Sequence, residues 1–314
     1  MASDRMFIAA DIGGTKIRAG VFDANLTLLQ SVQRPSNATS GREALLVALA
    51  AAIDAVIEPF ANKNFAGIGI STAGVVNAKT GDIEDATEAI PGWRNTRLGG
   101  LLAARYKVPV VVENDVKAAL LGELHAAPAL CAGRVVMLTL GTGLGGALAE
   151  RGQIVAGARH LAGHFGRMPM PNPWHFGQWL TLEALVSGTG LARVANESAV
   201  GDVRETFANG HAVLDAVQAG NTQAARGLNL FCDYLAMALQ QIGWSLDPDH
   251  IVLGGGLTEA RSLWWHLLEA RLAEAGQPLP VVAATLNNDA GMVGAATLIR
   301  DRLNAPQKDA HDVK

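Results

Sequence analysis

The chain has 314 residues and a net charge of −4; 49% of its residues are apolar and only 17% are charged, against about 25% in a typical globular protein. This composition excludes a disordered chain, and a mildly acidic protein without a Lys/Arg run is a poor candidate for binding nucleic acid or a membrane surface. At roughly 100–200 residues per domain, the length predicts two domains.

No segment has the character of a targeting signal or a membrane span. The first apolar run covers only Phe7–Ala10, and the longest one, Ala44–Ile53, falls far short of the roughly 20 residues that cross a bilayer. Cys131 and Cys232 fit no metal or redox spacing, which is typical of a reducing compartment. We therefore expect a cytoplasmic protein.

The first part of the chain alternates predicted strands and helices. We expect strands over Phe7–Ala10, Ile17–Phe22, Leu26–Val32, Phe65–Ser71 and Val108–Val112. Ser40 and Glu43 have the spacing of a capping box, which predicts a helix over Ala44–Ile57. Another helix is expected to begin at Asp115 or Val116.

The second part repeats the opening pattern of strand, glycine turn, strand, turn and strand. The two glycine turns lie about 129 residues apart (Gly13 to Thr142), which suggests a duplicated domain. The expected strands are Arg134–Leu140, Ala147–Ala149, Gln153–Val155, His250–Leu253 and Pro280–Ala284, and the expected helices are Glu183–Glu197, Ala212–Leu239, Thr258–Ala275 and Asp289–Leu303. Alternating strands and helices predict an α/β fold.

Three glycine-rich turns each follow a predicted strand: Gly13-Gly14-Thr15, Gly141–Gly146 and Gly254–Gly256. Glycine lets backbone N–H groups come close to a phosphate. None of the three is a Walker A motif, and the first two precede a strand, which excludes a Rossmann fingerprint. They read either as plain hairpin turns or as β-hairpins whose tips bind phosphate.

These motifs resemble those of the ROK (repressor, open reading frame, kinase) family of sugar kinases along nearly the whole chain. The matching segments are Asp11-Ile-Gly-Gly-Thr-Lys16, Glu113-Asn-Asp115, Leu140-Gly-Thr-Gly-Leu-Gly-Gly146, Ile251-Val-Leu-Gly-Gly-Gly256 and Asn288-Asp-Ala-Gly-Met-Val-Gly-Ala295. The resemblance implies a two-lobed actin-like (RNase H-like) ATPase fold with duplicated β-sheet domains and ATP in a central cleft. Residues 1–119 with 290–314 would form the N-terminal lobe, with the sugar, phosphate and magnesium contacts. Residues 120–289 would form the C-terminal lobe, with the nucleotide and the sugar loop.

The resemblance also implies roles for individual residues. Asp115 would be the base that deprotonates the sugar hydroxyl, with Asn114, Gly74 and Glu183 as sugar contacts; Asn114 or Asp115 could instead cap the next helix, and Glu183 could be a first-turn helix glutamate. Asp11 would hold Mg²⁺ through water, since Mg²⁺ keeps several waters beside one or two carboxylates. The expected phosphate contacts are Gly13, Gly14, Thr15, Lys16, Gly141, Thr142 and Gly143, and the expected nucleotide contacts are Gly254, Gly255 and Gly256. Lys16 could equally be a solvated surface lysine.

One departure from the family pattern concerns zinc. Many members carry a structural site of one His and three Cys, but here Phe176 and Thr181 stand in place of two of the cysteines. His160, His164 and His175 lie nearby without any cysteine, and a structural zinc site needs four ligands. We expect ATP and Mg²⁺ as cofactors and no zinc.

A second departure concerns the sugar. His164 stands where the family's glucokinases have Glu, within Leu161-Ala-Gly-His-Phe-Gly166, which resembles the LAGHxG stretch of N-acetylmannosamine kinases. An imidazole can donate as well as accept hydrogen bonds, which suits an N-acetyl carbonyl, although His164 could also be a structural loop histidine. Arg167 replaces a family His and could favour a more oxygen-rich or acidic sugar or pair with Glu183, and Ala89 replaces a common Asn.

The lead hypothesis is an ATP-dependent kinase acting on the C6 hydroxyl of a hexose or N-acetylhexosamine, with N-acetylmannosamine as the preferred candidate. Two alternatives stay open: a glucokinase or other hexokinase of the same family, and a non-catalytic sugar-binding relative. An NAD enzyme is disfavoured because Gly254–Gly256 is not part of a GxGxxG motif. The expected partners are a sugar and ATP, with no nucleic acid and no membrane, in a homodimer or homotetramer.

Overall fold

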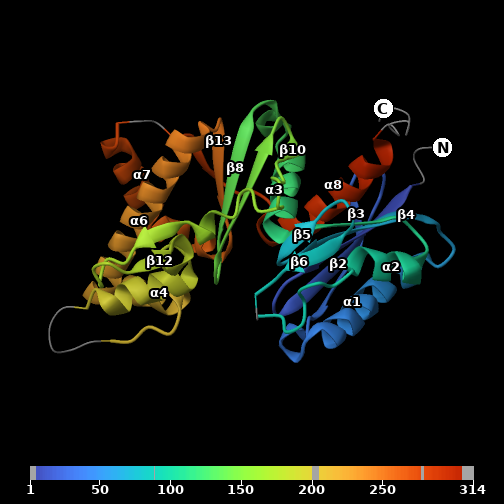
Figure 1. Ribbon diagram of the computed structural model, residues 1–314, viewed down its shortest axis with the longest axis horizontal. Helices are drawn as coiled ribbons and strands as arrows, with labels where there is room; N and C mark the ends of the chain where they lie inside the picture. The colour runs from blue at the N-terminus through green and yellow to red at the C-terminus, as the bar shows by residue number, and fades with distance from the viewer. Residues whose placement is uncertain (1–4, 88, 200–204, 277–278, 306–314) are drawn as a thin grey trace. The chain divides into compact units, whose positions relative to one another are not determined.

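A computed structural model of the chain describes residues 5–87, 89–199, 205–276 and 279–305 (Figure 1). The chain divides into two compact units, one made of residues 1–126 and 289–314 and the other of residues 127–288. Each unit is built on one five-stranded mixed sheet. Among the described residues, no helix is long and apolar enough to cross a membrane.

The sheet of unit 1 has the strand order β3-β2-β1-β4-β7. Its strands are β1 (Met6–Ile12), β2 (Lys16–Phe22), β3 (Leu28–Pro35), β4 (Phe65–Thr72) and β7 (Val110–Asn114). Strands β1, β2 and β3 form an antiparallel meander, whereas β4 and β7 run parallel to β1. A small hairpin, β5 (Val75–Asn77) with β6 (Asp82–Asp85), follows β4.

Helices cover both faces of this sheet. Alternate side chains of β1 point to opposite faces and are apolar on both, so each face needs a covering layer. Ile8 and Ala10 pack with Leu45 and Leu49 of α1, while Phe7 packs on the other face with the C-terminal helix α8. The helices and 3₁₀ turns of unit 1 are η1 (Ala38–Ser40), α1 (Arg42–Ile57), η2 (Glu58–Phe60), α2 (Leu98–Tyr106), α3 (Asp115–Ala126) and α8 (Ala290–Asn304). The last helix of the chain therefore belongs to the sheet of the N-terminal unit.

Unit 2 repeats the topology of unit 1 with the order β10-β9-β8-β13-β14. Its strands are β8 (Arg134–Leu140), β9 (Leu144–Glu150), β10 (Gln153–Ile154), β13 (His250–Gly254) and β14 (Val281–Ala283). Again the first three are antiparallel, and the last two run parallel to the first. This equivalence confirms the duplicated mixed α/β fold predicted from the two glycine turns.

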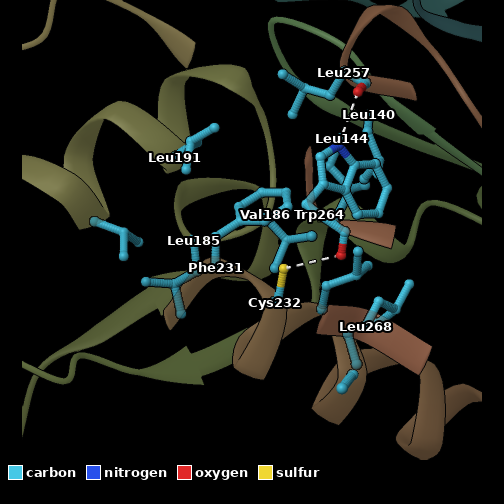
Figure 2. Close-up of a cluster of buried hydrophobic side chains, with 14 of the residues drawn as sticks. Leu140, Leu144, Leu185, Val186, Leu191, Phe231, Cys232, Leu257, Trp264 and Leu268 are labelled. Carbon is cyan, nitrogen blue, oxygen red and sulfur yellow. Dashed lines mark hydrogen bonds between the residues drawn. The ribbon is translucent and has the colours of Figure 1, made fainter. Parts of the chain in front are cut away.

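The core of unit 2 forms between its sheet and a group of helices. Figure 2 shows Trp264 at its centre, where the indole Nε1–H donates to the carbonyl of Leu257 at 3.1 Å and the ring packs edge-on against Phe231. The remaining elements are η3 (Pro128–Ala132), η4 (Phe165–Arg167), β11 (Pro169–Pro171), β12 (Trp179–Thr181), η5 (Leu182–Ala184), α4 (Gly188–Glu197), α5 (Gly210–Gln218), α6 (Thr222–Leu246), η6 (Gly256–Leu263), α7 (Trp265–Glu274) and η7 (Asn287–Asp289). Leu140, Leu144 and Leu185 belong to the same cluster, so the core fixes both the second glycine turn and the segment after β12.

Several predicted helix limits were wrong, each for a local reason. The capping box does not form, because α1 is preceded by Gly41 at φ 94° and no side chain caps it. The helix predicted over Ala212–Leu239 is two helices, since Gly220 adopts φ 82° and Asn221 caps α6 through its side chain. Likewise Ser187 caps α4, which shortens the helix predicted from Glu183, and η6 replaces the start of the helix predicted from Thr258.

Candidate active site

The parallel strands of unit 1 place a row of polar residues at one sheet edge. Asp11 of β1 pairs with Ser71 of β4, which in turn pairs with Glu113 of β7. The Ser71 hydroxyl donates to Asp11 Oδ1 at 2.5 Å. Parallel strands end at the same edge, so this register brings Asp11 next to the segment that carries Asn114 and Asp115.

The carboxylate of Asp11 sits in a tight enclosure. A Cβ on Gly291, in the first turn of α8, would come within 2.6 Å of its Oδ1, so only glycine allows this approach. The pKa of Asp11 is raised to about 6: burial is the main cause and the nearby charge of Asp115 adds to it, whereas the Ser71 hydrogen bond and the charges of Arg18 and Lys16 act in the opposite direction. The two carboxylates are thus electrostatically coupled.

Asn114 and Asp115 form the junction between β7 and α3. Asn114 Oδ1 accepts from the N–H groups of Val116 and Lys117 at 3.1 and 3.2 Å, so Asn114 caps the helix. Its Nδ2 donates to the Gly74 carbonyl at 3.0 Å and to Asp115 Oδ1 at 2.8 Å. Burial raises the pKa of Asp115, while the hydrogen bonds from Val116 and Asn114 lower it. Asp115 is therefore held in one orientation with a proton affinity above that of an ordinary aspartate.

The first glycine turn is the tip of the hairpin between β1 and β2. The Gly13 N–H donates to the Lys16 carbonyl at 2.9 Å, and Gly14, Thr15 and Lys16 are exposed. The N–H groups of Gly14 and Thr15 make no hydrogen bond within the described part of the chain. Two adjacent, unpaired N–H groups beside a lysine are suited to an anion.

The second glycine turn is also the tip of a hairpin, here between β8 and β9. The Gly141 N–H donates to the Gly143 carbonyl at 3.0 Å, and within the described ranges the N–H groups of Thr142 and Gly143 make no hydrogen bond. Glu183 Oε2 accepts from the Leu144 N–H at 2.8 Å, and its Oε1 makes no hydrogen bond to any described residue. A Cβ on Gly143 would lie 2.4 Å from that Oε2, so the glycine permits the contact.

The remaining predicted residues of unit 2 gather around this hairpin. Gly254 pairs with Thr139 at the end of β8, and a Cβ on Gly255 would lie 2.6 Å from the Leu140 nitrogen. His164 precedes η4, whose Gly166 packs against the backbone of Leu144. Arg167 ends η4 and is exposed, and its pairing with Glu183 stays a prediction.

Sequence reasoning missed the hydroxyl residues that support these groups. Ser71 holds Asp11, Ser36 bonds the first turn and Thr189 bonds the second. Only Ser71 carries a usable signal, because it ends the predicted strand Phe65–Ser71 and polar residues at strand ends can meet at one edge of a sheet. Ser36 and Thr189 lie 22 and 47 residues from their partners in the sequence.

The acidic group at Asp11 fits a magnesium ion held through water. It offers one partly buried carboxylate, and the neighbouring Asp115 adds a second negative charge. Nowhere in the described ranges do three His, Cys, Asp or Glu side chains form a group that could hold a metal ion. Any metal here would keep most of its ligands as water or phosphate oxygens.

We expect protein purified without added zinc to contain no stoichiometric zinc and to keep its activity in a zinc chelator. The physical reason is that the His160–His175 loop offers no thiolate, whereas structural zinc sites use four ligands. Elemental analysis of the purified chain measures this directly. One zinc ion per chain would contradict the prediction, and His160, His164 and His175 would then be the ligands to replace.

Comparisons with known proteins agree with this geometry. The model of the ROK family matches residues 7–302. A glucokinase of Halalkalibacterium halodurans is 29% identical over 98% of each chain, and an N-acetylgalactosamine kinase of Shewanella sp. is 31% identical over 93% of this chain and 96% of its own. Among solved structures, a Streptomyces griseus glucokinase in complex with glucose and AMPPNP (27% identity, 94% and 99% coverage) has a TM-score of 0.76. A Listeria monocytogenes protein proposed to be an N-acetylmannosamine kinase has a TM-score of 0.79, with 27% identity over 95% of this chain and 100% of its own.

Proposed function

Because the chain belongs to the ROK family and is a sugar kinase, we propose that it transfers the γ-phosphate of ATP to the C6 hydroxyl of a hexose or N-acetylhexosamine. The observation that supports this most is the fixed, half-buried carboxylate of Asp115 beside Asn114 and Asp11. A phosphoryl-transfer site requires one such base together with groups that neutralise phosphate charge.

Asp115 performs the proton transfer. One carboxylate oxygen accepts from Asn114 and Val116, which fixes the plane of the group and leaves the other oxygen for the sugar hydroxyl. As the hydroxyl oxygen attacks the γ-phosphorus, its proton passes to Asp115 and the bond from phosphorus to the β,γ-bridging oxygen breaks, which releases ADP. The raised proton affinity of Asp115 favours this transfer.

The glycine turns and Asp11 serve the phosphates. The free N–H groups of each turn bind phosphate oxygens, and Lys16 adds a positive charge at the first turn. Mg²⁺, when bound, neutralises charge on the β- and γ-phosphates, and Asp11 would hold it through water. Gly254–Gly256 would lie against the nucleotide, where side chains would obstruct it.

We propose N-acetylmannosamine as the preferred sugar. The support is His164, which can donate a hydrogen bond to an N-acetyl carbonyl where a carboxylate could only accept. Glu183 retains one carboxylate oxygen for sugar hydroxyls. The likeness to a glucokinase and to an N-acetylgalactosamine kinase supports the broader class and keeps glucokinase as the second candidate.

The test is a coupled assay of ADP release over a panel of sugars with purified protein. We expect the highest kcat/KM on N-acetylmannosamine among N-acetylmannosamine, N-acetylglucosamine, N-acetylgalactosamine, glucose, mannose, fructose and allose. A preference for glucose would establish the second candidate. Sugar binding without turnover on any member would instead indicate a non-catalytic relative. We also expect a homodimer or homotetramer, which light scattering measures.

Replacing His164 by Glu should reverse the preference toward glucose. A carboxylate repels the N-acetyl carbonyl but accepts hydrogen bonds from the C1 and C2 hydroxyls, and one such contact changes discrimination by roughly 10-fold or more. The measurement is the ratio of kcat/KM on N-acetylmannosamine to that on glucose. His175→Glu, in the same loop, is the matched control and should leave the ratio unchanged. An unchanged ratio in His164→Glu would remove His164 from the sugar site.

A further inference from the structure

Both glycine turns are bonded by a hydroxyl side chain from outside the hairpin. The Ser36 hydroxyl donates to the Gly14 carbonyl at 2.9 Å, and the Thr189 hydroxyl donates to the Thr142 carbonyl at 2.6 Å. Backbone N–H groups add to each contact: Ser36 N–H donates to the Thr15 carbonyl at 3.0 Å, and Gly188 N–H donates to the Gly141 carbonyl at 2.7 Å. In each turn the carbonyls are engaged, whereas the neighbouring N–H groups make no hydrogen bond within the described ranges.

These contacts determine where the unpaired N–H groups point. A trans peptide is planar, so its C=O and the N–H of the next residue point in opposite directions. Anchoring the Gly14 carbonyl therefore aims the Thr15 N–H away from Ser36, and anchoring the Thr142 carbonyl aims the Gly143 N–H away from Thr189. Loss of either anchor would let the peptide plane rotate.

Domain duplication does not account for the two hydroxyl contacts made by Ser36 and Thr189. Ser36 directly follows β3, whereas Thr189 lies in the first turn of α4, and the strand equivalent to β3 in unit 2 is β10. The two units thus reach the same arrangement with elements that do not correspond. The start of α4 is itself held in place, since the Ser187 hydroxyl accepts from the Gly190 N–H and donates to the Glu183 carbonyl.

Satisfying a buried carbonyl does not explain the Thr189 contact. Thr142 and Thr189 are both exposed, so water could serve the Thr142 carbonyl equally well. The first turn of α4 also lies close to the hairpin, because a Cβ on Gly188 would come within 2.9 Å of the Gly141 carbonyl oxygen. A directed hydroxyl at this place orients the turn rather than stabilising the fold.

We propose that Ser36 and Thr189 are positioning residues that aim the N–H groups of Thr15 and Gly143 at the phosphates of ATP. This inference rests on the proposed function, which assigns the two turns to phosphate. This role requires no contact between either side chain and the nucleotide. Each acts through the peptide plane that its hydroxyl holds.

The test compares Ser36→Ala and Thr189→Val with wild type for binding of AMPPNP with Mg²⁺, measured by calorimetry, and for thermal unfolding. In Thr189→Val only the 3.4 Å contact from the Thr189 N–H to the Thr142 carbonyl remains. We expect each variant to bind AMPPNP about 3- to 10-fold more weakly, the range for losing one oriented hydrogen bond. Thr189→Ser keeps the hydroxyl and should restore wild-type affinity.

Thr297→Val is the control, because the Thr297 hydroxyl donates to the Val293 carbonyl at 2.9 Å within α8, away from both turns. It removes a hydroxyl hydrogen bond of the same kind and should bind AMPPNP like wild type. Variants that bind AMPPNP as wild type does would overturn the inference alone. A wild-type protein that binds no AMPPNP would overturn the proposed function, and this inference with it.

Discussion

Replacing Asp115 by Asn should lower kcat by about 10²–10⁴-fold, the usual cost of losing a general base. The amide keeps the shape of the side chain and an oxygen that accepts from Asn114 and Val116, so ATP and sugar should bind with unchanged affinity. Steady-state kinetics together with calorimetric titration of AMPPNP separates the two effects. Near wild-type turnover in the variant would show that Asp115 is not the base.

Two further readouts sharpen this test. Asp249→Asn is the matched control, because Asp249 accepts from the Arg134 N–H in unit 2 and an amide oxygen can replace it; its activity should stay normal. In wild type, burial places the pKa of Asp115 above its ordinary 3.8, so activity should be lost, as pH falls, at a higher pH than an unperturbed aspartate would give. In Asp115→Asn the acid loss of the residual activity should move to lower pH, because the charge that helps to raise the pKa of Asp11 is gone.

Replacing Gly294 by Ala should cause the largest loss of stability among single glycine changes in α8. A Cβ at this position would lie 1.7 Å from the Ala118 carbonyl oxygen. Because that oxygen belongs to the backbone of α3, no side-chain rotation can relieve the clash, and α3 and α8 would have to move apart. Such overpacking costs roughly 1–3 kcal/mol, and we expect the upper end of that range. Chemical denaturation measures the change in the free energy of unfolding.

Gly100→Ala is the matched control for this change. Gly100 lies in α2, and a Cβ at this position would meet no described atom within 4 Å, so the same substitution should be neutral or should stabilise the helix by about 0.5–1 kcal/mol. The Gly294 variant should also lose activity, because α3 begins at Asp115. Equal stability of the two variants would show that the helices tolerate separation.

The central strands β1, β8 and β13 were predictable because they are short, mostly apolar runs with an acidic residue or glycine at or next to their ends. Val108–Val112 was expected as a strand, and β7 covers Val110–Asn114. The break between α5 and α6 could not be predicted, because the apolar residues keep a helical spacing through Gly220 and Asn221, where one helix ends and the next begins. Periodicity alone does not distinguish one long helix from two that share an apolar face.

The candidate site divides in the same way. Asp11, Asp115 and the glycine turns were found from local motifs, and the structure gathers those of each unit at the end of its sheet. Ser36 and Thr189 could not be found, because their partners depend on how distant segments pack. The contact between Glu183 and Leu144 likewise joins η5 to the hairpin across 39 residues of sequence.

The most direct test of the account is to identify the phosphorylated product by NMR after incubating wild-type protein with Mg²⁺-ATP and N-acetylmannosamine. We expect stoichiometric ADP and a single new phosphomonoester whose phosphorus couples to the C6 protons of the sugar. The Asp115→Asn sample, analysed after the same time, should contain almost none. A phosphate on C1 or on a secondary hydroxyl, or ADP release that does not depend on sugar, would contradict the proposed C6 kinase.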